Sequence, residues 1–405
     1  MIKYYRFNII IIFIFLIILF FINNIIFNRK PKNRNYPLYF KEIEEELDEI
    51  QRYIDLTLNE TFIDKVDVFL PLKKPKISII IAVYNGEGYL KKTLLSVQNQ
   101  DFKDIEIVII DEHSIDNSLN LIKKLMDKDK RIVLYQNNEN KGIMYTKIKA
   151  ILLARGKYIL ILDEDDIYGQ RDAFSVLYRE AETNNLDLLE FRLIYSSKKL
   201  KKFKYRRNKN DTQIIYQPSL SEKMFGHSSN GEIKMSRGLL QYYFIKRNIL
   251  VKAIKQIDKK YLYRNINHFE DYLIFFLLTR IANNCKYIDR FFYIKFFGWN
   301  KNEPAVKFRL INKYKDIKNR QCFSLLEYLE IMLSKTKNTF SDKKIAVFCF
   351  NKLFLQNKYC KNNTIYRERA KSISQLYLDN KYIQDKDKYN ISLYLKEINS
   401  KNILI

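Results

Sequence analysis

The sequence predicts an α/β protein with a mostly parallel central sheet, preceded by a membrane helix and a stem and followed by a helical region. Three observations support this fold class. Short apolar runs alternate with segments of helical period between residues 77 and 191, which is typical of βαβ units. An unbroken apolar run covers residues 9–22. From about residue 322 onward, the spacing of apolar residues is helical throughout.

Composition limits the function classes. The 405 residues are 47% apolar and 29% charged, which is typical of a folded chain of two or three domains. The net charge of +26 would suit nucleic-acid binding. The abundant residues all have A/T-rich codons, however, which explains the excess of Lys equally well, so we expect no nucleic-acid partner. The four cysteines form no CxxC pair, so no zinc centre is predicted.

Residues 1–30 are predicted to be a membrane anchor. The stretch from Ile9 to Phe27 spans about 28 Å as a helix, close to the thickness of the hydrocarbon core. A cleaved signal peptide is the alternative, but it requires small residues, and no Ala, Gly or Ser precedes Ser78. We therefore expect a single-pass membrane protein, in the inner membrane of a bacterium or in the Golgi or ER of a eukaryote. Basic residues on both sides leave the orientation open.

Residues 31–75 are predicted to be a stem. Apolar residues recur at helical spacing from Ile43 to Leu58 among acidic residues, which indicates an amphipathic helix. This helix could dock on the chain's own domain or mediate self-association, and the oligomeric state stays open.

Alternating strands and helices are predicted next, and polar residues follow three of the strands. In open α/β sheets, ligands bind at the carboxyl ends of the strands, so we expect a ligand site there. The predicted strands are 77–83, 105–111, 132–136 and 158–162, and the predicted helices are 89–98, 118–126, 145–154 and 171–183.

The acidic run at residues 163–166 carries the most chemistry. Four adjacent side chains, Asp-Glu-Asp-Asp, repel one another after an apolar strand, and a bound cation would relieve that repulsion. Carboxylate oxygens without His or Cys suit Mg²⁺ or Mn²⁺, which bind diphosphates. The alternative is a solvated turn that caps the next helix. No GxxxxGK[ST] occurs and no GxGxxG follows a strand, which argues against a glycine-rich phosphate loop.

These motifs, taken in order, resemble family 2 glycosyltransferases of the GT-A fold. The resemblance rests on Ile77–Gly86, Ile105–Asp111, Asn140-Lys-Gly142 and Leu162–Asp166. It implies a GT-A domain over residues 76–305, with a nucleotide half (76–192) and an acceptor half (193–305). It also implies a nucleotide-diphosphate-sugar donor, a UDP-sugar foremost, a divalent metal, and inversion at the anomeric carbon.

The resemblance also assigns roles residue by residue. Relatives carry Gly where this chain has His113, so the backbone conformation of this loop could differ from that of the family. Ile148 and Ala150 also depart from the family pattern. The residues placed at the nucleotide are Ala82, Tyr84 and Asn85 after the first strand, Asp111 and Glu112 after the second, Lys147 near the diphosphate, and Asp163 and Glu164 in the acidic run; Asp163 and Asp165 form the metal-binding DxD pair.

The general base is expected in the sequence His268-Phe-Glu-Asp271, just before an apolar helix at 272–281. It resembles the family's Glu-Asp motif, in which Asp271 would accept the proton of the acceptor hydroxyl, with Glu270 as the next choice. The alternative is that both carboxylates merely favour a helix N-terminus.

The acceptor cannot be identified from the sequence and could be a glycan, a lipid or a protein. A basic run at 195–207 would face it, and the lack of a Gln-x-x-Arg-Trp motif disfavours a processive polymerase. Residues 306–405 contain no motif and are read as a helical appendage. The competing hypothesis is a degenerate GT-A domain that only binds a nucleotide sugar or acts as a scaffold.

Overall fold

The computed structural model describes residues 74–196, 213–217, 219–220, 239–257, 261, 270–296, 371–372, 375 and 392, all within the compact unit Asp64–Ile405. The predicted membrane anchor, the stem, nearly all of the basic run and nearly all of the C-terminal helices lie outside the described residues. Within the described part, no helix has both the length and the apolar character needed to span a bilayer.

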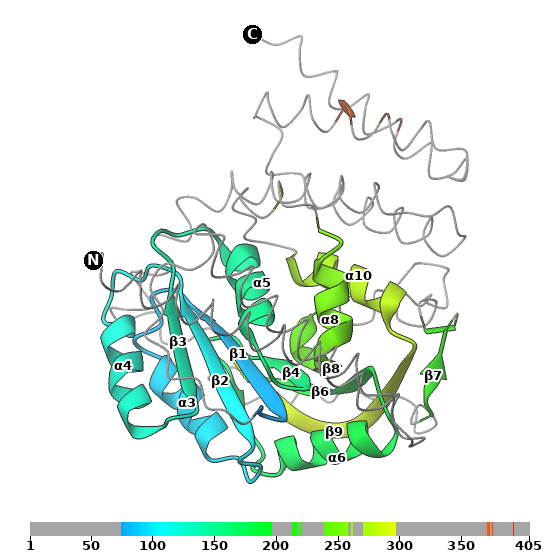
Figure 1. Ribbon diagram of the computed structural model, residues 1–405, viewed down its shortest axis with the longest axis horizontal. Helices are drawn as coiled ribbons and strands as arrows, with labels where there is room; N and C mark the ends of the chain where they lie inside the picture. The colour runs from blue at the N-terminus through cyan, green and yellow to red at the C-terminus, as the bar shows by residue number, and fades with distance from the viewer. Residues whose placement is uncertain are drawn as a thin grey trace, which may run out of the picture. The chain divides into compact units, whose positions relative to one another are not determined.

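The described residues form a mixed sheet of nine strands in the order β3-β2-β1-β4-β8-β6-β9-β5, with β7 pairing with β9 (Figure 1). The four strands predicted from the sequence are all present. The strands are β1 (Ile77–Val83), β2 (Ile105–Asp111), β3 (Ile132–Gln136), β4 (Tyr158–Ile161), β5 (Ile167–Tyr168), β6 (Leu188–Ser196), β7 (Ile215–Tyr216), β8 (Tyr243–Lys246) and β9 (Asn284–Phe296).

The centre of the sheet is parallel and fully buried. Strand β1 pairs in parallel with β2 and with β4, and every residue of β1 and β2 is buried. A strand covered on both faces requires a near-continuous apolar run, which the Ile-rich segment Ile77–Val83 supplies. Its polar residue, Ser78, donates a hydrogen bond to Glu106 Oε1 on β2 (2.6 Å). The carboxyl ends of β1, β2 and β4 therefore meet at one edge of the sheet.

The prediction of a mostly parallel sheet is wrong beyond β4. Strand β8 runs antiparallel to both β4 and β6, while β5 and β7 run antiparallel to β9; of the pairings beyond β4, only that of β6 with β9 is parallel. Parallel neighbours need a crossover helix between them, and the strand–helix alternation that predicts such units stops near residue 191. The sequence pattern of a parallel sheet therefore does not apply to the strands that follow.

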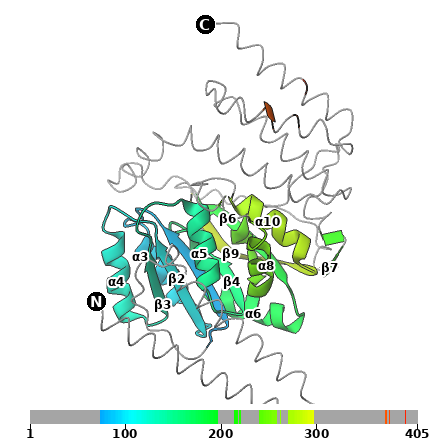
Figure 2. The same cartoon turned by 45° about the horizontal axis from the view of Figure 1, so that its top comes forward.

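Helices cover both faces of the sheet (Figures 1 and 2). On one face α6 lies beside the end of α3, where Ser175 Oγ donates to Asp101 (2.7 Å). On the other face, α8 packs against both α5 and α10. The described helices are α3 (Leu90–Gln98), α4 (Ser118–Lys128), α5 (Ile143–Leu153), α6 (Ala173–Thr183), α8 (Arg247–Ile254) and α10 (Glu270–Ile281), with a 3₁₀ turn η1 (Leu240–Tyr242).

Two helices begin earlier in the chain than predicted, and both differences bear on the site. Helix α5 begins at Ile143 rather than Tyr145, directly after Gly142, whose φ of 92° favours glycine. Helix α10 begins at Glu270 rather than Tyr272, so that Glu270 and Asp271 form its first turn. Both carboxylates are buried there.

Candidate active site

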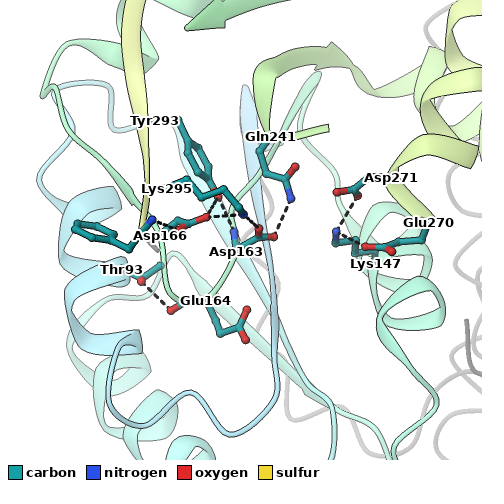
Figure 3. Close-up of polar contacts among 11 residues, drawn as sticks. Thr93, Lys147, Asp163, Glu164, Asp166, Gln241, Glu270, Asp271, Tyr293 and Lys295 are labelled. Atoms are coloured by element: carbon teal, nitrogen blue, oxygen red, sulfur yellow. Dashed lines mark hydrogen bonds and ion pairs between the residues drawn. The ribbon is translucent and has the colours of Figure 1, made fainter. Parts of the chain in front are cut away.

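The acidic run forms an ordered turn directly after β4. The backbone N–H of Asp166 donates to the carbonyl of Asp163 (3.1 Å), which closes the turn. From helix α3, Thr93 Oγ1 donates to the carbonyl of Glu164 (2.8 Å), as Figure 3 shows. Glu164 and Asp166 are buried, and Asp163 and Asp165 are half-buried. The run is therefore built into the domain rather than solvated.

Asp163 is held on both of its carboxylate oxygens. Lys295 Nζ lies 2.6 Å from Oδ2, and Gln241 Nε2 donates to Oδ1 (2.9 Å). Burial raises the pKa of Asp163, but the ammonium groups of Lys295 and Lys147 outweigh burial and hold this pKa well below its usual range. Asp163 is therefore ionised at neutral pH.

Asp166 anchors the turn to strand β9. Tyr293 donates its hydroxyl to Asp166 Oδ2 (2.8 Å), Lys295 Nζ contacts the same oxygen (3.1 Å), and the backbone N–H of Phe296 donates to Oδ1 (2.9 Å). Burial, followed by repulsion from Asp163, raises the pKa of Asp166 to about 7. No motif in the sequence indicates individual roles for Asp166, Tyr293, Lys295 or Gln241.

A second cluster joins the two halves of the domain. Lys147 Nζ, on α5, lies 2.8 Å from Glu270 Oε1 and 2.8 Å from Asp271 Oδ1, at the start of α10 (Figure 3). All three side chains are buried. Burial raises the pKa of Asp271 to about 6 and the charges of Glu270 and Asp163 add to this, because one ammonium serves two carboxylates. The predicted contact of Lys147 with a diphosphate stays a prediction.

Two buried polar atoms at the carboxyl ends of β1 and β2 have no hydrogen-bond partner among the described residues: Asn85 Nδ2 and Asp111 Oδ1. The other oxygen of Asp111 accepts from the backbone N–H of Ser114 and from Gln136 Nε2, both at 3.2 Å. Burial raises the pKa of Asp111. An unpaired buried acceptor is costly, so this oxygen is suited to a donor group of a ligand.

The neighbouring predicted residues lie close to these two atoms. Asn85 Oδ1 accepts from the backbone N–H of Ile115 (2.9 Å), which ties the end of β1 to the loop after β2. Ala82 is buried within β1, and Tyr84, 36% exposed, lies at its end. His113 adopts a φ of 57°, so the left-handed backbone that a glycine would favour is kept despite the substitution.

Glu112 is buried and contacts the loop before α5. Its carboxylate accepts from the backbone N–H groups of Lys141 and Gly142 and from Asn137 Nδ2 (3.0 Å). It thereby holds the loop before α5, which is a structural contact with the protein itself. Burial raises the pKa of Glu112 to about 7, despite these hydrogen bonds. Its predicted contact with the nucleotide stays a prediction.

The carboxylates of the acidic turn suit a divalent ion that is also coordinated by substrate phosphates. Among the described residues, no group of three or more His, Cys, Asp or Glu side chains is arranged to hold a metal ion. Mg²⁺ is commonly bound through one or two carboxylates together with substrate phosphates and water. The half-buried carboxylate of Asp165 suits such an ion, whereas a contact from Asp163 requires Lys295 to leave it.

The sequence is similar to known glycosyltransferases. Residues 78–245 match the model of glycosyl transferase family 2. An uncharacterized glycosyltransferase of Haemophilus influenzae is 41% identical over 95 residues, covering 24% of this chain and 38% of that protein. A GalNAc(5)-diNAcBac-PP-undecaprenol β-1,3-glucosyltransferase of Campylobacter jejuni is 37% identical over 93 residues, covering 23% and 30%. The alignments thus span well under half the length of these relatives.

Solved structures show the same fold over a larger share of the chain. Residues 1–349 of S. aureus TarS, crystallised in complex with UDP, superpose with a TM-score of 0.57 at 16% sequence identity, covering 81% of this chain and 88% of that one. Residues 78–245 therefore form a domain that is similar to family 2 glycosyltransferases, and its fold is of the GT-A type.

Proposed function

We propose that this protein transfers a sugar from a nucleoside-diphosphate donor, a UDP-sugar foremost, to a hydroxyl group of an acceptor, with inversion at the anomeric carbon and with a divalent ion. The observation that carries the proposal is the buried cluster of Lys147, Glu270 and Asp271. It supplies a carboxylate whose pKa of about 6 suits proton transfer at neutral pH.

The donor site is proposed at the carboxyl ends of β1 and β2. The unpaired atoms Asp111 Oδ1 and Asn85 Nδ2 offer one acceptor and one donor, which suits a nucleoside with both kinds of group. Crystal structures of S. aureus TarS in complex with UDP and with UDP-GlcNAc support a uridine nucleotide, because that protein has the same fold.

In the proposed reaction, Asp271 takes the proton from the acceptor hydroxyl as the hydroxyl oxygen attacks the anomeric carbon. Inversion requires attack from the face opposite the departing diphosphate. Lys147 keeps Asp271 in place through the 2.8 Å contact, and Glu270 shares that ammonium. A positioned base of this kind contributes roughly 10²- to 10⁴-fold to the rate.

A divalent ion, Mg²⁺ or Mn²⁺, would be held by Asp165 and the donor's phosphates. Bound there, the ion supplies positive charge for the departing diphosphate. The turn between β4 and β5 fixes the position of Asp165, because Asp166 next to it is tied to Tyr293 and Phe296.

The acceptor and the location are proposed more coarsely. Two relatives are named as β-1,3-glucosyltransferases acting on saccharides linked to undecaprenol diphosphate, which favours a lipid-linked glycan as acceptor. A membrane-bound acceptor agrees with an N-terminal anchor over Ile9 to Phe27, which the sequence supports. A bacterial inner membrane is the proposed location.

The competing hypothesis of a degenerate, binding-only domain rested on His113, Ile148 and Ala150. Two of these residues, Ile148 and Ala150, are buried and belong to the core of α5. His113 adopts a φ of 57°, in the left-handed region that glycine favours. None of the three removes a group from the clusters around Asp163 and Asp271, so the enzyme is the better-supported proposal.

The test is a screen of the purified full-length chain in detergent against a panel of nucleotide sugars, with Mn²⁺ or Mg²⁺. Donor hydrolysis and thermal shift are both recorded. We expect one donor class to raise the melting temperature and to be hydrolysed slowly to the nucleoside diphosphate. A chain that is stabilised by no nucleotide sugar would contradict the proposal, whereas binding without turnover in all acceptor mixtures would favour the scaffold.

A further inference from the structure

Lys295 is a positive charge built into the acidic turn from a distant part of the chain. It lies near the end of β9, and its side chain is 22% exposed. Its Nζ contacts Asp163 Oδ2 at 2.6 Å and Asp166 Oδ2 at 3.1 Å (Figure 3). The ammonium group therefore occupies the very carboxylate that the sequence predicts as a metal ligand.

The position of Lys295 conflicts with a metal ion on Asp163. A divalent ion of this type binds a carboxylate oxygen at about 2.0–2.1 Å. Since Nζ lies 2.6 Å from Oδ2, an ion on the same oxygen would lie at most about 4.7 Å from the ammonium group. The other oxygen, Oδ1, already accepts from Gln241. Two cations so close repel each other strongly at a half-buried site.

Lys295 also has a second anchor, which makes its release from Asp163 feasible. Asp166 Oδ2 accepts from Lys295 and from Tyr293, and Oδ1 accepts from the backbone of Phe296. Asp166 is therefore fixed whether or not Lys295 contacts Asp163. The ammonium group of Lys295 can therefore break its contact with Asp163 and still retain its ion pair with Asp166.

We propose that Lys295 and a divalent ion compete for Asp163, so that Lys295 keeps the acidic turn closed to metal until the donor's diphosphate arrives. The diphosphate adds the negative charge that lets both cations stay in the site. Metal binding and nucleotide binding are then strongly coupled. This inference rests on the proposed function only in taking the acidic turn as the place of the metal and the diphosphate.

The experiment measures Mn²⁺ binding directly, by the EPR signal of free Mn²⁺, on the full-length protein without donor or acceptor. Each variant is titrated in the absence and in the presence of UDP. We expect the wild type to bind Mn²⁺ weakly alone and much more tightly with UDP. In Lys295→Met, Mn²⁺ alone should bind about tenfold tighter or more, because the competing charge is gone, and the enhancement by UDP should shrink accordingly.

Lys286→Met is a matched control. Lys286 lies on the same strand, is 20% exposed and pairs with Glu180 at 2.8 Å, away from the acidic turn. Its removal should leave Mn²⁺ binding at the wild-type level. Lys295→Arg keeps the charge and should also keep Mn²⁺ binding weak. The double variant Lys295→Met/Asp163→Asn should not show the tighter Mn²⁺ binding of Lys295→Met, because it lacks the Asp163 carboxylate for which the two cations compete.

Folding is checked by thermal unfolding, and Lys295→Gln serves as a second variant because its amide can still donate to Asp166. The proposal is overturned if a folded Lys295→Met or Lys295→Gln protein binds Mn²⁺ no more tightly than the wild type. It is also overturned if wild-type Mn²⁺ affinity is the same with and without UDP, a result that also contradicts an ion shared by Asp165 and the donor's phosphates but leaves sugar transfer with Asp271 as the base intact. Failure of every variant to bind UDP would instead contradict the proposed function and the inference together.

Discussion

Lys147 Nζ lies 2.8 Å from Asp271 Oδ1, which links two residues 124 positions apart in the chain. Lys147 belongs to the half of the domain that carries the nucleotide motifs, and Asp271 lies in the first turn of a helix of the other half. Both side chains are buried, and Glu270 shares the same ammonium group. The proposed base is therefore held by the half of the domain that is expected to bind the donor.

Asp271→Asn tests the base. The substitution is nearly isosteric and removes only the proton acceptor, so we expect kcat to fall by roughly 10²- to 10⁴-fold. Donor affinity should stay near the wild-type value, because a base acts in the transition state. The measurements are kcat and the donor Kd on the same preparation. Asp289→Asn is the control, since Asp289 is exposed and pairs with Arg192 and Tyr287.

A different result for Asp271→Asn would be informative. If both kcat and donor Kd stay within a few-fold of wild type, then Asp271 is a helix-terminal carboxylate, which Asn can replace at a cost of at most about 1 kcal/mol. Glu270 would then be the next candidate, tested as Glu270→Gln.

The pH dependence of the reaction follows from the pKa of Asp271. Only the ionised carboxylate can accept a proton, and burial together with Glu270 raises its pKa to about 6. We therefore expect kcat/KM to fall about tenfold for each pH unit below roughly 6 and to level off above it. A profile that stays flat between pH 5 and 7.5, in a protein shown to be folded over that range, would contradict this assignment.

Asp165→Asn tests the metal. If Asp165 and the donor's phosphates hold the ion, the substitution should lower turnover and weaken UDP binding in the presence of Mn²⁺. UDP binding in EDTA should change little, because the nucleoside contacts at Asp111 and Asn85 are separate. Isothermal titration with and without Mn²⁺ measures both. Wild-type activity that is unchanged in EDTA would remove the metal from the mechanism.

The sequence predicted the nucleotide half of the fold closely, because periodicity reports on buried strands and amphipathic helices. β1, β2 and β3 have the predicted bounds, and the predicted strand 158–162 extends one residue beyond β4. The strands beyond β4 were not predicted, since they come from segments without a regular strand–helix alternation. The long strand β9 pairs with β5, β6 and β7, and these are contacts that no local pattern encodes.

The site was predicted only where a local motif carries it. The acidic turn and the pair Glu270–Asp271 follow strand and helix ends, which are visible in the sequence. Gln241 and Lys295 reach Asp163 across 78 and 132 positions, and each is a single polar residue in an apolar, aromatic-rich segment without a recognisable motif. Asp166 was visible as part of the run, but its partner Tyr293 was not. Charge balance inside a site is thus the part that needs the tertiary structure.

Glu112→Gln tests the buried glutamate in the loop before α5. The pKa of Glu112 is about 7 in the folded protein, against about 4.3 in an unfolded chain. The folded state therefore binds this proton more tightly, and the resulting stability is complete below about pH 4 and is lost as the pH rises through 7. Between pH 5 and 7.5, the decrease in the free energy of unfolding should be smaller in the variant than in the wild type, and the difference should be on the order of 2 kcal/mol.

Chemical denaturation across this pH range measures the effect of Glu112→Gln. The variant should be less stable than the wild type at pH 5, because its new amide nitrogen meets that of Asn137, so the slope rather than the absolute value carries the prediction. Glu87→Gln, at an exposed residue of a neighbouring loop, should keep the wild-type slope. Equal slopes for Glu112→Gln and the wild type would contradict the proton assignment.

Lys147→Met tests the cation that joins the two halves of the domain. Removing it leaves Glu270 and Asp271 buried without their ammonium group, and breaking a buried ion pair from one side costs about 3–5 kcal/mol of unfolding free energy. The loss should be smaller at pH 5.5 than at pH 7.5, because a proton can then replace the missing charge. The acidic limb of kcat/KM should also move to higher pH, because the ammonium group that lowers the pKa of Asp271 is gone.

Lys147→Arg should restore much of the stability. Lys157→Met, at a more exposed pair with Glu182, should cost less than about 1 kcal/mol of unfolding free energy. Equal losses for Lys147→Met at the two pH values would show that Lys147 acts through packing and not through its charge.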